Sequence, residues 1–477
     1  MSRSPHALAL TIALTSALVT LTSTPAGADP AAIDAILAKL PKTARVGIVV
    51  EDGESGRVLY ERNADTPLRP ASNQKLVTLA AAILGLGPDY RHRTELRAAG
   101  PVAGNRLFGD LHLIGGGDPN LSRRFQDPSQ PASDVPILIE WAQTLLRRGI
   151  REIRGDLVAD DRFFDRELWH PDWEKADHAK WYAAEVSALN LNDNCVDIEF
   201  HAGAKPRVQL IPPTGWLEVS SDLSATSDRK KHVYGVSRSF GSNAVTVRGR
   251  LWTGAGVGRT EITVHDPALF FATALKESLA RAGIRLTGKV RRVKDGEQAK
   301  GELLACHESP LPLTLSICGK RSLNLYAECL LKTLGRETAG EGSWKAGAKA
   351  VTAVLDKAGA TMPKAVIADG SGLCRANRLT ARGLTRLLAV MARSPHDNLY
   401  RSCLAAGGID GTLRRRFRKL PAGCRVEAKT GTLRDTSALS GYLIKPGKTA
   451  PLRFAILMND TPGARRLQDR IVAALLK

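Results

Sequence analysis

The hydrophobic pattern near the start of the chain has a period of two and then changes to the period of a helix. Residues 45–51 and 57–62 alternate between apolar and polar side chains around the turn-forming segment 52–56, which predicts a β-hairpin. A short helix over residues 31–40 is expected before it. From Ser72 onward apolar residues recur at helical spacing, so a helix with one broad apolar face is predicted to begin there.

The central part of the chain has a different texture, in which short β-like runs are separated by glycine, aspartate and proline. Such runs occur at residues 109–119, 155–160, 207–211, 244–251 and 260–264. Short runs bounded by turn residues are typical of strands. We therefore predict that residues 91–299 form β-rich inserted domains, two in number, with one nested in the other.

The last part of the chain is mainly helical and then returns to strands. Helices are predicted at residues 323–334, 344–358, 380–392 and 464–476, and strands at residues 425–433, 439–444 and 452–458. Together with the N-terminal hairpin, this order predicts one α/β domain formed by residues 29–90 and 300–477. Both ends of the chain would then contribute to the same sheet.

Residues 1–28 have the pattern of a signal peptide. Arg3 and His6 form a short basic start, residues 7–21 are apolar apart from Thr and Ser, and Ala26-Gly27-Ala28 offers a small-x-small cleavage site. An uncleaved anchor is the alternative, but the apolar stretch is short for a membrane span. We expect an exported protein that is periplasmic or extracellular.

Cysteine spacing and the distribution of charge bear on two classes of site, zinc sites and nucleic-acid-binding surfaces. None of the seven cysteines forms a C-x-x-C pair or another zinc-ligand spacing. The formal net charge is +20, yet it is spread along the chain and its densest run, residues 414–419, accompanies no nucleic-acid-binding signature. We expect no nucleic-acid partner. Peripheral attraction to an anionic wall or membrane surface is one interpretation of the charge, and a solvated face is the other.

The first chemical motif is Ser72-Asn73-Gln74-Lys75, at the start of the predicted apolar helix. A serine hydroxyl becomes a good nucleophile only when a base takes its proton. Residues i and i+3 at a helix start share one face, so Lys75 can reach Ser72, and the helix N-terminus favours negative charge there. A second S-x-x-K at Ser227 is surrounded by polar residues, and no amphipathic helix follows it.

The second motif is Ser322-Leu323-Asn324, where a loop enters an apolar helix. A functional interpretation gives a hydroxyl for proton relay and an amide that holds the substrate's peptide group. The alternative is an ordinary helix N-cap, which is the usual role of a serine in such a position.

The third motif is Lys429-Thr430-Gly431, followed by Thr432, on a predicted strand. A glycine inside a strand indicates that something approaches the backbone closely, and a substrate added as an extra strand would do so. Lys429 would supply a cation and the threonines hydroxyls for a terminal carboxylate. A strand edge protected by a lysine is the alternative.

The order S-x-x-K, S-x-N, K-T-G is found in penicillin-binding proteins and class A β-lactamases. The chain resembles the D-alanyl-D-alanine carboxypeptidase/endopeptidase family, the low-molecular-mass class C penicillin-binding proteins, over nearly its whole mature length. Further similar segments are residues 70–72, 115–119, 187–190, 369–373 and 411–413. The long insertion between the first two motifs argues against a β-lactamase. Cys374 departs from the pattern, where serine is expected.

The resemblance implies a β-lactamase/D,D-peptidase-like α/β domain, with a central antiparallel sheet flanked by helices, and a serine D-Ala-D-Ala carboxypeptidase that also has possible D,D-endopeptidase activity. Peptidoglycan stem peptides would be its substrates and β-lactam antibiotics its covalent inhibitors. The resemblance implies no metal and no organic cofactor. The implied roles are nucleophile for Ser72, base for Lys75, proton relay for Ser322 and substrate binding for Asn324, Lys429, Thr430, Gly431 and Thr432. A β-lactamase or esterase of the same fold, and a catalytically silent wall-binding protein, are the competing hypotheses.

Overall fold

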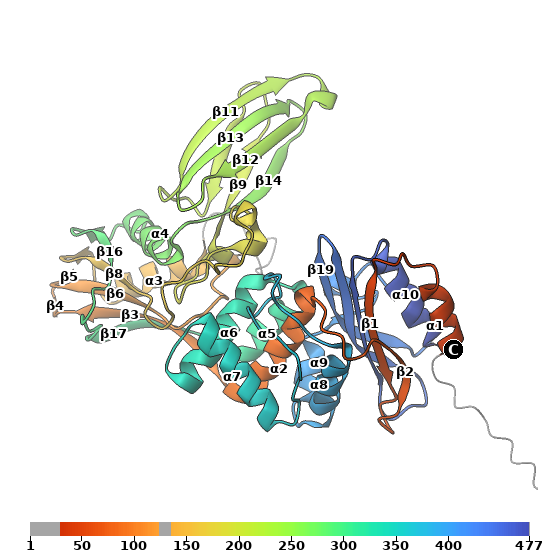
Figure 1. Cartoon of the computed structure of the whole chain (residues 1–477). Coiled ribbons are helices and arrows are strands. Elements are labelled where there is room, and N and C mark those ends of the chain that lie inside the picture. The colour runs from red at the N-terminus through yellow and green to blue at the C-terminus, as the bar shows by residue number, and fades with distance from the viewer. Residues whose placement is uncertain (1–28, 124–134, 477) are drawn as a thin grey trace, which may run out of the picture.

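The computed structural model describes residues 29–123 and 135–476. The predicted signal peptide therefore lies outside the described residues. Figure 1 shows an elongated molecule: a sheet built from both ends of the chain stands at one side, helices occupy the centre, and the inserted sheets extend to the other side and above. No helix in residues 29–123 or 135–476 combines the length and apolar character needed to cross a bilayer.

Both chain ends contribute to one six-stranded sheet of order β18-β19-β20-β21-β1-β2. Its strands are β1 (Arg45–Glu51), β2 (Val58–Arg62), β18 (Ala405–Ala406), β19 (Arg425–Leu433), β20 (Thr436–Ile444) and β21 (Leu452–Asn459). The predicted hairpin is present as β1 and β2, and β1 pairs antiparallel with β21 so that Ile48 lies opposite Ile456. The predicted α/β fold with a shared antiparallel sheet is confirmed.

Helices cover both faces of this sheet. On one face α1 (Pro30–Leu37) and α10 (Ala464–Ala474) pack against Ile48 and its neighbours, and on the other α8 (Ala381–Arg393) packs near Val49. Successive residues of a strand point to opposite faces, so a strand covered on both sides needs an almost continuous apolar run. The buried run of β1 meets that requirement.

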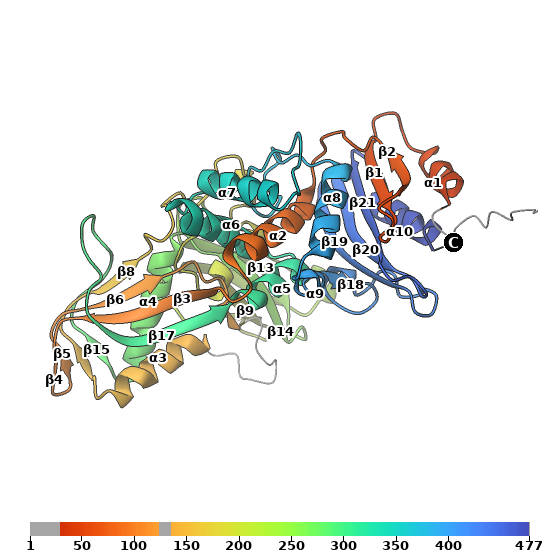
Figure 2. The same ribbon diagram turned by 90° about the horizontal axis from the view of Figure 1, so that it is seen from below.

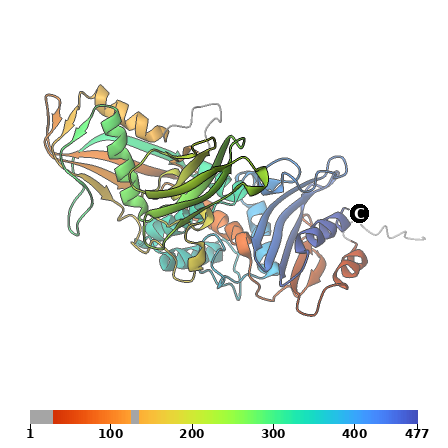
Figure 3. The same cartoon turned by 90° about the horizontal axis from the view of Figure 1, so that it is seen from above.

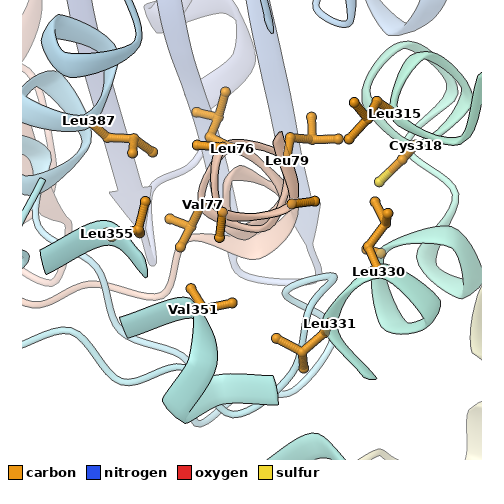
Figure 4. Packing of buried hydrophobic residues seen from close by; sticks show 14 of the residues in the cluster. Leu76, Val77, Leu79, Leu315, Cys318, Leu330, Leu331, Val351, Leu355 and Leu387 are labelled. Atoms are coloured by element: carbon orange, nitrogen blue, oxygen red, sulfur yellow. The ribbon is translucent and has the colours of Figure 1, made fainter. Parts of the chain in front are cut away.

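Helix α2 (Gln74–Leu86) lies at the centre of a helical core. The helices around it are α5 (Leu311–Arg321), α6 (Asn324–Ala339), α7 (Trp344–Lys357) and α8, with the short α9 (Asp397–Ser402) nearby. Figure 4 shows Leu76, Val77 and Leu79 of α2 surrounded by leucine and valine side chains from these helices. A helix that is buried on nearly every side places its first turn, including Lys75, away from water.

The inserted residues form a second layered unit (Figure 2). Its five-stranded sheet has the order β16-β8-β6-β3-β17, and a small sheet has the order β15-β7-β5-β4. The strands are β3 (Arg91–Ala99), β4 (Val102–Ala103), β5 (Arg106–Leu107), β6 (Asp110–Gly115), β7 (Glu152–Ile153), β8 (Leu157–Asp160), β15 (Arg285–Leu286), β16 (Val290–Arg292) and β17 (Glu302–Pro310). This unit also holds two helices, α3 (Pro136–Arg147) and α4 (Pro267–Arg281), that the β-rich pattern did not predict. Each begins with a proline, a helix-start signal that the strand pattern obscured.

Six further strands form a region of their own above the five-stranded unit (Figure 3). They are β9 (Cys195–His201), β10 (Arg207–Ile211), β11 (Glu218–Thr226), β12 (Val233–Arg238), β13 (Ala244–Trp252) and β14 (Val257–Thr263), in two three-stranded sheets. They lie between β8 and α4 in the chain, so we propose that this region is nested in the first insertion. Because β17 pairs with β3, we place the return to the helical core after Pro310 rather than at residue 300.

Candidate active site

Ser72 lies in a one-turn 3-10 helix, η1 (Ala71–Asn73), directly before α2. Lys75 is in the first turn of α2, and its Nζ lies 3.2 Å from Ser72 Oγ, as the i, i+3 spacing predicts. Ser72 is only partly buried, whereas Lys75 is completely buried. The hydroxyl thus faces the surface while the amine contacts it from the interior.

Lys75 is held by two further acceptors. Its Nζ lies 2.6 Å from Asn324 Oδ1 and 2.9 Å from the Ser371 carbonyl oxygen. Burial lowers the pKa of Lys75, and the nearby Cys318 and Glu328 act in the opposite direction. A lysine whose ammonium form is disfavoured by burial gives up its proton more readily, which a general base requires.

Ser322 and Lys429 form a second serine–lysine pair in the same cleft. Lys429 Nζ donates to Ser322 Oγ at 2.8 Å and to the Thr430 carbonyl oxygen at 3.0 Å. Ser322 joins α5 to α6 with a left-handed φ of 63°, and the N-cap of α6 is Leu323. Ser322 is therefore not the N-cap of that helix, and its strained backbone instead directs the hydroxyl to Lys429.

Lys429 is also completely buried, and burial lowers its pKa well below the usual value, with repulsion from Lys75 as the next cause. The amide of Asn73 donates to the Lys429 carbonyl oxygen at 2.8 Å, which fixes the nucleophile turn against β19. Both lysines lie in the interior below the floor of the cleft, and each contacts one serine.

Gly431 has a different structural reason from the one the sequence suggests. A Cβ at this position would come within 2.7 Å of the Pro70 carbonyl oxygen and 3.1 Å of the Ser72 amide nitrogen. The glycine is therefore required by the turn that carries Ser72. On the outer side of β19, the short β18 pairs only with Glu427 and Ala428. Among the described strands none pairs with residues 430–432 on that side, so this edge is available to an added strand.

The two pairs open into a cleft of about 730 Å³. Of the predicted site residues, Ser72, Ser322, Asn324, Thr430 and Thr432 line it. One wall comes from inserted residues 174–182, with the side chains of Glu174, Asp177, Trp181 and Tyr182. The other comes from residues 411–416 and the start of α10. The side chains predicted from three distant motifs are thus brought together.

Three groups in the site were not assigned from sequence. The Ser371 carbonyl oxygen, which contacts Lys75, belongs to segment 369–373, which is similar to the family's pattern but has no role assigned from sequence. Tyr182 accepts a hydrogen bond from Asn324 Nδ2 at 2.7 Å through its carbonyl oxygen, and Thr412 Oγ1 lies 2.9 Å from Thr430 Oγ1. Tyr182 comes from the insertion and carries no motif signal.

Glu328 of α6 supports the loop that contacts Lys75. Its carboxylate accepts from the amides of Gly370 at 2.9 Å and Ser371 at 2.8 Å, and from Trp344 Nε1 at 2.9 Å. Burial, together with the nearby Asp369, raises the pKa of Glu328 to about 7. A buried acid with three donors fixes the loop and places negative charge near the Lys75 amine.

Other candidates from the sequence lie outside the cleft lining. Ser187 is buried and accepts from the Leu189 amide, and Asp118 is buried and accepts from the Asn120 amide at 2.8 Å. Asp160 likewise accepts from the Arg162 amide at 3.2 Å. Asp161 is buried near Arg292. Asp118 and Asp160 therefore cap turns of the insertion.

Neither the cysteines nor the cluster of possible ion ligands in the described residues supplies a further catalytic group to the cleft. All seven cysteines lie in the described residues as free thiols. His170, Asp172 and Cys374 bring possible ligand atoms within 4.8 Å of one another. Both ring nitrogens of His170 are already engaged, one by the Asp172 amide and the other by the Ala368 carbonyl oxygen. We assign no ion to this cluster.

Comparison with known proteins is consistent with this geometry. The family model described as "D-Ala-D-Ala carboxypeptidase 3 (S13) family" matches residues 30–476. The D-alanyl-D-alanine carboxypeptidase of Actinomadura sp. (strain R39) is 34% identical over 93% of this chain and 83% of its own length. The D-alanyl-D-alanine carboxypeptidase DacB of Haemophilus influenzae is 27% identical over 85% of this chain and 83% of its own length.

A solved structure shows the same fold over nearly the whole chain. The crystal structure of penicillin binding protein 4 (dacB) from Haemophilus influenzae superposes with a TM-score of 0.78 at 25% identity, covering 92% of this chain and 98% of that one. From the match over residues 30–476 and the 34% identity to the Actinomadura enzyme, we conclude that this chain belongs to the D-Ala-D-Ala carboxypeptidase 3 (S13) family.

Proposed function

We propose that the chain is a serine D-Ala-D-Ala carboxypeptidase that cleaves peptidoglycan stem peptides through an acyl-enzyme on Ser72. The observation that carries this proposal is the pair of serine–lysine contacts, Ser72–Lys75 and Ser322–Lys429, at the base of one cleft. Curated relatives of the same family are named for this activity. No metal or organic cofactor takes part in the proposed reaction.

In the acylation step, neutral Lys75 takes the proton of Ser72 Oγ, and the oxygen attacks the carbonyl carbon of the penultimate D-alanine. The amides of Ser72 and Thr432 would bind the developing oxyanion, and each such donor is worth about 3 kcal/mol of barrier. The Ser72 amide lies on the side of the turn that faces Gly431, where a side chain would obstruct it.

Departure of the terminal D-alanine needs a proton and a site for its carboxylate. We assign proton delivery to Ser322, helped by Lys429, and carboxylate binding to Thr430 and Thr432, which line the cleft beside it. A carboxylate arriving there would raise the pKa of Lys429, because an opposite charge favours the ammonium form. Repulsion between the two amines would then favour neutral Lys75, so substrate binding itself prepares the base.

The remaining assignments concern the substrate peptide and the surroundings. Asn324, which lines the cleft, would hold the substrate amide, and the unpaired edge at residues 430–432 would receive the peptide as an added strand. β-Lactams would acylate Ser72 as substrate analogues. The same cleft also suits cross-linked peptides, which gives D,D-endopeptidase activity. We further propose export of the mature chain and attraction of its basic surface to the anionic wall.

Mass spectrometry after brief and long exposure to a penicillin tests this function. We expect a long-lived adduct on the peptide that contains Ser72, no adduct in Ser72→Ala, and release of D-alanine from a stem-peptide substrate. A short-lived adduct with hydrolysis of the drug would identify a β-lactamase instead. Absence of both the adduct and D-alanine release from a folded sample would refute the proposed enzyme.

A further inference from the structure

The wall of the cleft next to Thr430 and Thr432 is strongly basic. Seven of the lining residues are arginines and only two, Glu174 and Asp177, are acidic. The arginines are Arg321, Arg375, Arg414, Arg415, Arg416, Arg434 and Arg465. This excess of positive charge exceeds what one substrate carboxylate, bound by the threonines, requires.

Some of these arginines are neutralised within the protein. Arg375 pairs with Asp435 at 2.5 Å and Arg434 approaches Glu174 at 3.7 Å. By contrast, Arg414, Arg415 and Arg465 form no ion pair with any acidic side chain of residues 29–123 or 135–476, and all three are exposed. They therefore present unneutralised guanidinium groups to the cleft.

The elements that carry these three side chains are fixed in place. Arg416 links the segment that carries Arg414 and Arg415 to α10, because its guanidinium pairs with Asp469 of that helix at 2.6 Å. The neighbouring Thr412 contacts Thr430 of β19 at 2.9 Å. Arg465 lies in the first turn of α10, where no side chain caps the helix, so free amides add positive potential. The segments that carry the three cations are thus joined to each other and to the strand that would bind the substrate carboxylate.

We infer that Arg414, Arg415 and Arg465 determine specificity by binding a carboxylate on the leaving-group side of the substrate. The occupant would be an anionic second peptide strand, as in a cross-linked substrate, rather than a single D-alanine. This inference rests on the proposed function, because Thr430 and Thr432 mark the leaving side only if they hold the substrate's carboxylate.

The chemistry favours a carboxylate-bearing peptide. A guanidinium presents a planar fork of donors that matches a carboxylate with two parallel hydrogen bonds. These arginines line the same cleft as Ser72 and Thr432, so one peptide bound in the cleft can contact both the reacting serine and the guanidinium groups. A separate phosphate polymer would have to enter the cleft in place of the substrate.

The test uses two synthetic substrates with the same acyl donor and a leaving peptide that ends either in a carboxylate or in a carboxamide. The wild type should prefer the carboxylate by about tenfold in kcat/KM, mainly through KM, as expected for charge-assisted hydrogen bonds. The triple variant Arg414→Gln/Arg415→Gln/Arg465→Gln should lose this preference. Arg418→Gln, in the same basic run but outside the cleft lining, is the matched control and should keep it.

Equal rates for both substrates in the wild type, or an equal loss for both in the triple variant, would overturn the inference. Binding of the two leaving peptides to Ser72→Ala, measured by fluorescence anisotropy, separates recognition of the carboxylate from catalysis. A carboxylate preference in binding that the triple substitution abolishes would support the site even if no D-alanine were released, an outcome that refutes only the proposed activity. Inorganic phosphate competing as well as the carboxylate peptide would refute carboxylate selectivity.

Discussion

The two serine–lysine pairs of the cleft differ in what surrounds each amine. Lys75 has three acceptors, Ser72 Oγ, Asn324 Oδ1 and the Ser371 carbonyl, and the acidic Glu328 lies nearby. Lys429 has two, Ser322 Oγ and the Thr430 carbonyl. Burial lowers both pKa values and Cys318 opposes the effect at both amines, but carboxylates such as Glu328 oppose it only at Lys75, while at Lys429 repulsion from Lys75 adds to it.

This difference has a mechanistic consequence. The carboxylate of Glu328 makes the ammonium form less unfavourable at Lys75 than at Lys429, so in the absence of substrate a proton is retained more readily at Lys75. A substrate carboxylate beside Lys429 would reverse that preference. Unequal surroundings therefore allow two similar pairs to act as a base and as a substrate-responsive cation. Substitutions in each pair test whether the two lysines have these different roles.

The largest effect is expected from the first pair. Ser72→Ala and Lys75→Ala should each lower kcat for D-alanine release by about 10⁴-fold or more, because the nucleophile and its base act as a unit. For the same reason the double variant should be no worse than either single variant. Steady-state kinetics with a stem-peptide substrate measures this. Independent, multiplying losses would show that Lys75 is not the base for Ser72.

An intermediate effect is expected from the second pair. Ser322→Ala removes the hydroxyl that Lys429 contacts at 2.8 Å, and kcat should fall by about 10²- to 10⁴-fold, the usual contribution of a positioned proton donor. Penicillin should still acylate Ser72, although more slowly. Stopped-flow acylation and adduct mass measure the change. A loss as large as that of Ser72→Ala would mean that the pairs are equivalent.

A pH-dependent effect should follow from Glu328, which acts on the first pair only. Removing its charge in Glu328→Gln should lower the pKa of Lys75 further and move the acidic limb of the kcat/KM profile to lower pH. The exposed Glu337→Gln, on the same helix, is the control and should leave the profile in place. An unshifted profile in Glu328→Gln would remove the acidic support assigned to Lys75.

Glu328 also gives a stability prediction with a defined sign. Its pKa is raised to about 7 from the usual 4.5 of a glutamate, so its protonated form favours the folded state. That contribution is present below about pH 4.5 and is lost as the pH rises through about 7. Urea titrations should therefore show the wild type losing unfolding free energy across this window relative to Glu328→Gln. A parallel pH dependence of the two proteins would contradict the raised pKa.

The two serine–lysine pairs also differ in how they could be predicted from the sequence. Short spacings predicted the Ser72–Lys75 contact, because a helix start fixes residues i and i+3. The order of the three motifs, through family resemblance, predicted that Ser322 and Lys429 join them. The strand-like run of residues 425–433 predicted the bounds of β19 correctly.

The missed features depend on tertiary packing. Glu328 is one polar residue inside an apolar helix, and only the fold shows that it meets the Gly370 and Ser371 amides. Tyr182 reaches the site from the insertion, beyond any local pattern. The need for Gly431 came from contact with Pro70, a residue far away in the chain. Helix α4 was missed because the surrounding β-like runs dominated the pattern.

The smallest effect is expected at Cys374, in the loop that supports Lys75 but not Lys429. Burial raises the pKa of its thiol to about 11, so it is neutral, and its Sγ accepts from the Ala376 amide at 3.4 Å. A serine hydroxyl keeps an acceptor there. Cys374→Ser should therefore change the unfolding free energy by less than about 1 kcal/mol and kcat/KM by no more than about twofold, measured by urea titration and steady-state kinetics.

Iodoacetamide labelling gives a second measure of the same thiol. The partly exposed Cys306 and Cys424 should react before Cys374 does, because a buried, protonated thiol is a poor nucleophile. A tenfold loss of kcat/KM in Cys374→Ser without loss of stability would show that the loop controls the position of the Ser371 carbonyl more tightly than its contacts indicate. The inequality between the two pairs would then depend on the loop as much as on Glu328.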